Sequence, residues 1–232
     1  MHLRRAWAAW ACLLSLSASF ARAGDDFTLQ FEPATVPGTY TVRVDAVLDA
    51  PPAAVRHALL HFCEYKETTA YMRQCVVFNV QGNEAWSYVL LDPPVLDPRD
   101  YINRRTIVQD LQPDGTGVMH LRYRQDHAAG PPPRDGVVRV QVNEGRWELA
   151  PRDHGTRTAI VYTLTLNPGG VVPLWMARLV ARRAAPESVR RVEAKARDLA
   201  RSGGVELPNP GAPWATVRVR PIPGAAITTR GD

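Results

Sequence analysis

The spacing of hydrophobic and polar positions changes three times along this chain, between the period of two that is typical of strands and the period of about 3.6 that is typical of helices. Between Gly38 and Leu48 apolar and polar residues alternate, and this period of two predicts a half-buried strand. Pro51 and Pro52 end the strand. Apolar residues then recur at helical spacing, which predicts a short helix over residues 52 to 63, with a second turn or two around Glu64 to Tyr71.

Most of the following chain has the pattern of strands separated by turn-forming Gly, Pro, Asn and Asp. The predicted strands are Gln74 to Gln81, Ala85 to Asp92, Asp100 to Gln109, Val118 to Asp126, Val137 to Leu149 and Arg157 to Leu166. Together with the first strand they predict a seven-stranded antiparallel sheet in meander order. One face of such a sheet has to be covered.

A long amphipathic helix is predicted after Pro173 and is the candidate to cover the sheet. Its apolar positions are Leu174, Trp175, Met176, Leu179, Val180, Val189, Val192, Ala196 and Leu199. Arginines supply the other side, and Pro186 is expected to kink or restart the helix. The proline-rich residues 203–232 are predicted to form an extended tail, ordered at most locally.

The first 23 residues have the pattern of a secretory signal peptide. Arg4 and Arg5 precede an apolar run from Ala6 to Leu14, and Ala21-Arg22-Ala23 is a small-x-small cleavage site. The run is too short to span a bilayer. We therefore expect a periplasmic or secreted protein with a domain over residues 24–202.

Charge and composition narrow the possible partners. Loss of the segment 1–23 removes three arginines and no acidic residue, so the formal net charge falls from +5 to +2. Nucleic-acid binding calls for a clustered basic face with aromatic residues that stack on bases, and a nearly balanced chain in an exported compartment is not expected to bind nucleic acid.

Two cysteines remain after the signal peptide, Cys63 and Cys75. In an oxidising compartment they can close a disulfide. Two buried free thiols are equally compatible with the sequence, because Cβ geometry decides between the two states.

Four short motifs occur in a fixed order at strand starts and strand ends. They are Arg99-Asp100-Tyr101, Val138-Arg139, Gly145 to Leu149 and Asn167-Pro168-Gly169-Gly170. Over roughly residues 35 to 201 they resemble a START domain, the lipid-binding branch of the helix-grip proteins. The resemblance implies an α+β fold in which a seven-stranded curved antiparallel sheet wraps around a long C-terminal helix, with two short helices after the first strand.

The resemblance also implies an internal cavity for a lipid or another hydrophobic small molecule. Its roof would be the final helix and the loop His127 to Gly136, with a hinge at Gly169-Gly170. The family often places a basic residue in the cavity, and this position falls on Arg105. The position of its usual acidic partner falls at about Trp86, so the buried ion pair of the family is not reproduced here. Glu84 lies nearby in the sequence, but close to a turn. A charge in an apolar cavity needs a partner, a ligand anion or water, so the ligand class stays open.

The predicted ligand-binding residues come from three predicted strands and the long helix. They are Asn103, Arg105, Met119, Leu121, Tyr123, Tyr162, Trp175, Met176 and Leu179. Arg105 and Asn103 share one strand face, which either lines the cavity or carries a salt bridge on the solvated side. The apolar members are core residues unless the sheet is concave. Trp147 is predicted to plug one end of the sheet.

No cofactor and no metal site is predicted. His57 and His61 have the spacing of two metal ligands on a helix, but no third ligand is implied and an exposed pair is favoured. The sequence offers no serine in a nucleophile elbow.

Three hypotheses of function follow. The first is a monomeric carrier that binds a hydrophobic molecule, contacts an anionic membrane transiently through its arginine-rich helix, and keeps its ligand when truncated at Ser202. The second is a cyclase- or dehydratase-like enzyme with Glu84, His120 or Tyr162 as acid or base. The third is a scaffold with a filled cavity whose tail recruits a partner.

Overall fold

The computed structural model describes residues 27–33, 36–65, 68–69, 71–94, 96–203, 205 and 211–223, so the predicted signal peptide lies outside the described residues. The strands are β1 (Phe27–Glu32), β2 (Tyr40–Leu48), β3 (Met72–Gln81), β4 (Glu84–Leu91), β5 (Arg99–Gln109), β6 (Met119–Gln125), β7 (Val138–Arg139), β8 (Val142–Arg152) and β9 (Arg157–Asn167). The helices are α1 (Pro52–Leu60), α2 (Leu174–Arg201) and the 3₁₀ turns η2 (His127–Ala129) and η3 (Asp153–Gly155).

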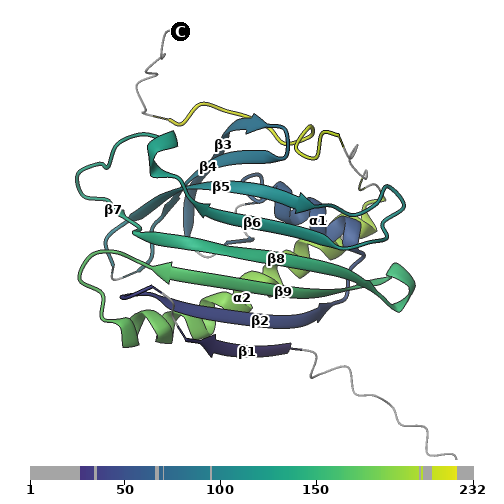
Figure 1. Ribbon diagram of the computed structural model, residues 1–232, viewed down its shortest axis with the longest axis horizontal. Helices are drawn as coiled ribbons and strands as arrows, with labels where there is room; N and C mark the ends of the chain where they lie inside the picture. Colours follow the sequence, from purple (N-terminus) through teal and green to yellow (C-terminus); the bar gives the residue numbers. More distant parts are fainter. Residues whose placement is uncertain are drawn as a thin grey trace, which may run out of the picture.

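The strands form one curved sheet with the order β1-β2-β9-β8-β6-β5-β4-β3 (Figure 1). All neighbours on this path are antiparallel, and β7 pairs with β5 in parallel, off the path. Six of the seven predicted strands are confirmed as single strands, and β1 is an additional strand. The predicted strand Val137 to Leu149 is divided into β7 and β8, because residues 138–139 pair with β5. Helices α1 and α2 pack on the concave face, where the large hydrophobic cluster lies.

Helix α2 crosses the sheet as a single element. Its buried face is made largely of small residues, with Ala177, Ala181 and Ala185 spaced four apart. The helix does not restart at Pro186, because it is continuous from Leu174 to Arg201. Proline removes the donor to the carbonyl four residues earlier, and that carbonyl belongs to Arg182, which is exposed.

The segment between α1 and β3 differs from the prediction. Among its described residues, 61–64 form a turn and Thr68 is in a 3₁₀ turn, so the second turn or two expected around Glu64 to Tyr71 appears as a 3₁₀ turn and not as an α-helix. A disulfide joins Cys63 to Cys75, with their Cα atoms 4.9 Å apart. The disulfide ties the end of α1 to the start of β3.

The loop His127 to Gly136 lies on the outer, convex face of the sheet, so the prediction that it roofs the cavity is wrong. The backbone N–H of Asp126 donates to Ile102 O over 2.8 Å, and Gly130 packs against the Ile102 side chain. Ile102 belongs to a second hydrophobic cluster on this face, together with Tyr88.

An ion pair joins two of the sequence motifs beneath this loop. Arg139 Nε donates to Asp100 Oδ1 over 2.7 Å, and its Nη2 donates to Pro131 O over 3.2 Å. Asp100 is 1% exposed and also accepts a hydrogen bond from the Tyr88 hydroxyl. The Arg-Asp step and the Val-Arg step therefore fasten the proline-rich loop to the outer face.

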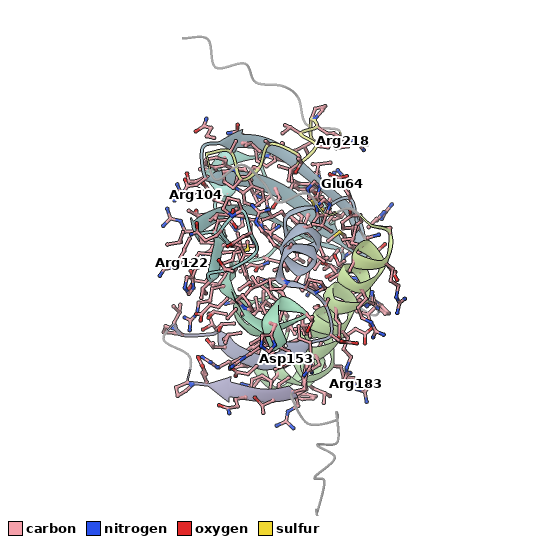
Figure 2. All side chains as sticks on the ribbon, turned by 90° about the vertical axis from the view of Figure 1, so that its right-hand side faces the viewer. Glu64, Arg104, Arg122, Asp153, Arg183 and Arg218 are labelled. Atoms are coloured by element: carbon pink, nitrogen blue, oxygen red, sulfur yellow. A yellow bond between two sulfur atoms is a disulfide. The ribbon has the colours of Figure 1, made fainter. Side chains whose placement is uncertain are left out.

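The described part of the tail, residues 211–223, is packed against the domain (Figure 1, yellow). Trp214 is 1% exposed within the main core, and Arg220 N donates to Val77 O over 2.8 Å beside a parallel bridge between Val77 and Val219. Figure 2 shows Arg218 beside Glu64, whose carboxylate lies 3.5 Å from the Arg218 backbone nitrogen. The prediction of an extended appendage is wrong for these residues.

Candidate ligand-binding cavity

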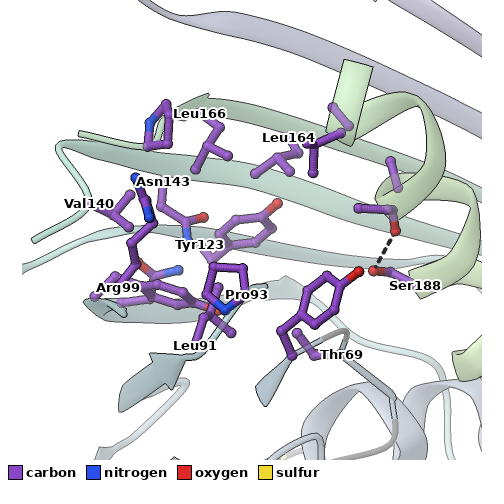
Figure 3. A pocket seen from close by; sticks show the side chains of 18 of the residues that line it. Thr69, Leu91, Pro93, Arg99, Tyr123, Val140, Asn143, Leu164, Leu166 and Ser188 are labelled. Carbon is purple, nitrogen blue, oxygen red and sulfur yellow. Dashed lines mark hydrogen bonds between the residues drawn. The ribbon is translucent and has the colours of Figure 1, made fainter. Parts of the chain in front are cut away.

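A cavity of about 300 Å³ lies between the concave face of the sheet and α2. It exists because the helix face directed at the sheet carries alanines instead of large side chains; Ala177, Ala181, Ala184 and Ala185 all line it. Figure 3 shows Arg99, Val140 and Asn143 close together on one side, with Tyr123 and Leu164 between them and Ser188 of α2. Most of the lining is apolar, as in ordinary small-molecule sites.

The polar lining comes mainly from one face of β5. Arg99, Tyr101, Asn103 and Arg105 alternate with outward-facing residues and all four line the cavity. Asn103 is 5% exposed, and its Oδ1 has no hydrogen-bond partner among the described residues. The same holds for Ser87 Oγ on the neighbouring strand. These buried acceptors point to a bound molecule or water, because unpaired buried polar groups are costly.

Arg105 is the central charge of the cavity and is 7% exposed. Its Nη1 donates to Leu59 O over 3.0 Å, and its Cζ lies 4.1 Å from the Phe62 ring centroid. No carboxylate of the described residues forms an ion pair with it. Burial lowers the pKa of Arg105 to about 10, so it is protonated at neutral pH.

The position where an acidic partner was expected does not face Arg105. Ala85 is the residue paired with Arg105 across β4 and β5, and the Trp86 indole donates to Asp126 on the outer face over 2.9 Å. Glu84 also lies on the outer face, where it accepts from Thr106 and pairs with Arg104 at 3.6 Å. Figure 2 shows Arg104 on the side of the sheet away from α2.

Among the tyrosines that line the cavity, Tyr101, Tyr123 and Tyr162 are kept neutral by burial. Burial raises the pKa of Tyr162 to about 12, and it also raises the pKa values of Tyr101 and Tyr123 above their ordinary value. Trp147 stacks on Tyr162 with ring centroids 4.2 Å apart and is part of the cavity wall. It was predicted instead to plug one end of the sheet.

Gly145 is the residue that allows Tyr123 to take this position. A Cβ at Gly145 would lie 2.0 Å from Thr163 O and 2.5 Å from the Tyr123 hydroxyl oxygen. The Tyr123 hydroxyl donates to Thr163 O over 3.2 Å across this gap. The glycine of the Gly145 to Leu149 motif therefore has a packing role in the cavity wall.

The predicted binding residues fall into two groups. Asn103, Arg105, Tyr123, Tyr162 and Met176 line the cavity. The other four do not: Met119 and Leu121 are fully buried core residues, and Trp175 and Leu179 are 66% and 56% exposed on α2.

Sequence reasoning missed other residues of the lining, among them Arg99, Ser87, Asn143 and Ser188. Arg99 could have been predicted, because side chains alternate between the two faces of a strand and Arg99 is therefore on the same face as Asn103 and Arg105.

The rim of the cavity lies between α2 and the segment that follows Cys63. Tyr71 and Val180 are the exposed lining residues, at 53% and 47%. Thr68 and Thr69 of the same segment also line the cavity. The disulfide therefore anchors one side of the entrance.

The remaining histidine and acid candidates lie elsewhere. His120 pairs across β6 and β8 with Glu148 on the outer face. His61 is 5% exposed, its ring stacks on His57 at 4.1 Å, and it contacts Glu64 and Thr216. The prediction of an exposed histidine pair is thus wrong. The described residues contain no cluster of three or more metal-ligating side chains and no helix apolar and long enough to cross a bilayer.

Comparison with known proteins gives one sequence relative at moderate similarity. The uncharacterized protein PA1579 of Pseudomonas aeruginosa is 28% identical over 116 residues, which are 50% of this chain and 53% of that protein. The chain thus spans about half the length of the curated relative it matches. No protein-family profile matches the sequence.

Solved structures match over most of the chain. The STAR-related lipid transfer protein of Xanthomonas axonopodis superposes with a TM-score of 0.64 at 18% identity and covers 76% of this chain and 97% of its own. Human STARD10 superposes with a TM-score of 0.60 at 17% identity, and the match covers 76% of this chain and 75% of STARD10. The Zhui aromatase/cyclase of Streptomyces superposes with a TM-score of 0.53 at 19% identity, and the match covers 72% of this chain and 99% of the cyclase. The fold is therefore a START, or helix-grip, α+β fold, as the motifs predicted.

Proposed function

We propose that this protein binds one hydrophobic or amphipathic small molecule in the cavity under α2 and carries or presents it outside the cytoplasm. The cavity itself is the observation that supports this most strongly, because it combines an apolar wall with buried polar groups that have no partner within the described part of the chain. Its volume of about 300 Å³ is at the lower end of the usual range for small-molecule sites. A single-chain or compact polycyclic molecule suits it better than a two-chain lipid.

Burial of ligand hydrocarbon would supply the binding free energy, at about 25 cal/mol per Å² of apolar surface. Arg105, Asn103 and the tyrosine hydroxyls would orient a polar end. The similarity in fold to lipid transfer proteins supports this class of ligand. Residues 1–23 support export to the periplasm or the medium, and we expect a monomer.

The experiment is native mass spectrometry of the exported protein, followed by extraction and identification of bound small molecules. We expect one apolar or amphipathic adduct per chain. Ala181→Phe places a ring in the cavity, because Ala181 is 3% exposed and lines it, and it should abolish the adduct. Leu179→Phe adds a ring on the exposed side of the same helix and should retain it.

A protein that stays empty after incubation with mixed lipids, or an adduct that survives Ala181→Phe in folded protein, would contradict the proposal. Circular dichroism of both variants shows whether they are folded.

A second candidate function is a cyclase-like enzyme, which the similarity in fold to an aromatase/cyclase favours. Of the three acid–base candidates, Tyr162 lines the cavity, while Glu84 and His120 are on the outer face. With its pKa raised to about 12, Tyr162 would donate a proton or hydrogen bond instead of acting as a base. Conversion of an extracted ligand over time, lost in Tyr162→Phe, would establish the enzyme.

A further inference from the structure

The C-terminal segment 211–223 reaches Arg105, one of the two arginines in the described lining of the cavity. The ring centroid of Trp214 lies 5.8 Å from Arg105 Cζ, and Trp214 is fully buried without lining the cavity itself. Arg105 therefore lies between the cavity and the tail. Its second aromatic neighbour, Phe62, lies after α1 and does line the cavity.

Several independent contacts hold the segment in this place. Arg56, which forms a buried ion pair with Asp110, also donates to Pro213 O at 3.4 Å. Thr216 Oγ1 is 3.1 Å from His61 Nε2, and Val217 is 8% exposed in the core. Beyond them the segment extends the sheet along β3 through its bridge between Val77 and Val219. The position of Trp214 is thus fixed on both sides along the chain.

Aromatic rings and a carboxylate stabilise a guanidinium in different ways. A carboxylate occupies the in-plane N–H donors and neutralises the charge. A ring attracts the cation through its face and leaves the in-plane donors available. Arg105 has two such rings, one backbone acceptor and, among the described residues, no carboxylate. Its charge and some of its donors remain available to the cavity that it lines.

We infer that the tail completes the ligand site, with Trp214 as a positioning residue that holds Arg105 ready for the carboxylate of an anionic amphiphile. This inference rests on the proposed function and names its ligand class. A carboxylate matches the guanidinium fork and carries the single charge that one arginine balances. Arg99 is the other arginine of the described lining, six residues or about 20 Å further along β5, too far to share the same headgroup.

The test compares the affinities of the mature full-length chain for dodecanoate, methyl dodecanoate and dodecyl phosphate at pH 8, by titration calorimetry. Wild type should bind dodecanoate about tenfold more tightly than the ester. Arg105→Gln should remove this preference. Trp214→Leu should reduce the preference for dodecanoate over the ester about fivefold, while its affinity for the ester stays within about twofold of wild type. Trp214→Phe should preserve most of the preference for dodecanoate.

Trp175→Leu is the matched control, because Trp175 is 66% exposed on α2 and lies outside the lining. Its acid-to-ester ratio should equal that of wild type. If Trp214→Leu does not fold, a fluorinated tryptophan placed at position 214 keeps the shape of the ring, weakens its negative face, and should lower the same ratio.

The outcomes separate the inference from the proposed function. Equal weakening of both probes by Trp214→Leu would show a purely structural role and overturn the inference, as would an unchanged ratio with the fluorinated ring. If wild type binds methyl dodecanoate and dodecanoate with equal affinity, the inference is overturned but the proposed binding function still stands. If wild type binds dodecyl phosphate more tightly than dodecanoate, the assignment of a carboxylate ligand is overturned. Binding of none of the three probes would count against both proposals.

Discussion

At the scale of single residues, Asp100 shows why an acidic side chain is needed at a fully buried position. Its carboxylate is 1% exposed and accepts from Arg139 and from the Tyr88 hydroxyl. Asp100→Asn would leave a largely buried guanidinium without its counter-charge, so we expect a loss of about 3–5 kcal/mol in the free energy of unfolding. Urea denaturation measures this loss.

Asp92→Asn is the matched control for this ion-pair experiment, since its pair with Arg73 is exposed and should contribute less than about 1 kcal/mol. The double variant Asp100→Asn/Arg139→Met should recover part of the loss, because no unpaired charge is left behind. Equal effects of the two single aspartate variants would refute the assigned role of the buried pair.

His57 should make the stability of the folded protein depend on pH. Burial, the neighbouring His61 ring and the charges of Arg56 and Lys195 lower its pKa to about 4, against an opposing effect of Glu64. The unfolded chain, with a histidine pKa of about 6.5, binds more protons between pH 4 and 6.5. Stability that is present above pH 6.5 is therefore lost as the pH falls toward 4.

The measurement is the urea midpoint at pH 7 and at pH 5 in wild type and His57→Gln. The variant should show a smaller drop between the two pH values. His120→Gln, on the outer face of the sheet, should show the wild-type drop. A variant at position 57 that loses as much stability as wild type would assign the pH dependence to other groups.

At the scale of elements, strands and helices with a strong period could be predicted, and elements that depend on distant partners could not. β2 and α2 have clear periods and were located within a few residues. The predicted strand Val137 to Leu149 is divided, because its first residues form β7, which pairs with β5 in parallel, and β8 begins only at Val142. β1 has an alternating pattern in Phe27, Leu29 and Phe31 that could have been recognised.

The disulfide links two elements and stabilises the entrance of the cavity. Closing the loop between Cys63 and Cys75 restricts the unfolded chain by about 3 kcal/mol in the loop-entropy estimate. We expect the double variant Cys63→Ser/Cys75→Ser to lose roughly that stability, and amide exchange at Thr68 and Thr69 on the rim to become faster. Reduction of wild type should reproduce both effects, while an unchanged urea midpoint would argue against the bond.

At the scale of the whole molecule, the sequence could predict the helix-grip architecture but not which face of the sheet each loop covers. The motifs place Asn103 and Arg105 on one strand face, and the structure confirms that both line the cavity. The loop His127 to Gly136 carries no periodic signal, and its position depends on Asp100 and Ile102 on the outer face. Likewise, a proline-rich composition says nothing about the pocket that receives Trp214.

The docked tail changes what truncation should do to the molecule. As a free appendage it could be removed after Ser202 without effect, but such a deletion would also remove Trp214 and Val217 from the core. Loss of one buried tryptophan side chain alone typically costs about 3–5 kcal/mol. We therefore expect the chain ending at Ser202 to unfold at lower urea concentration and to bind dodecanoate more weakly. A chain ending at Pro223 keeps every described contact and should behave as the full-length protein does; equal stability of the two truncated chains would show that the tail does not contribute to the fold.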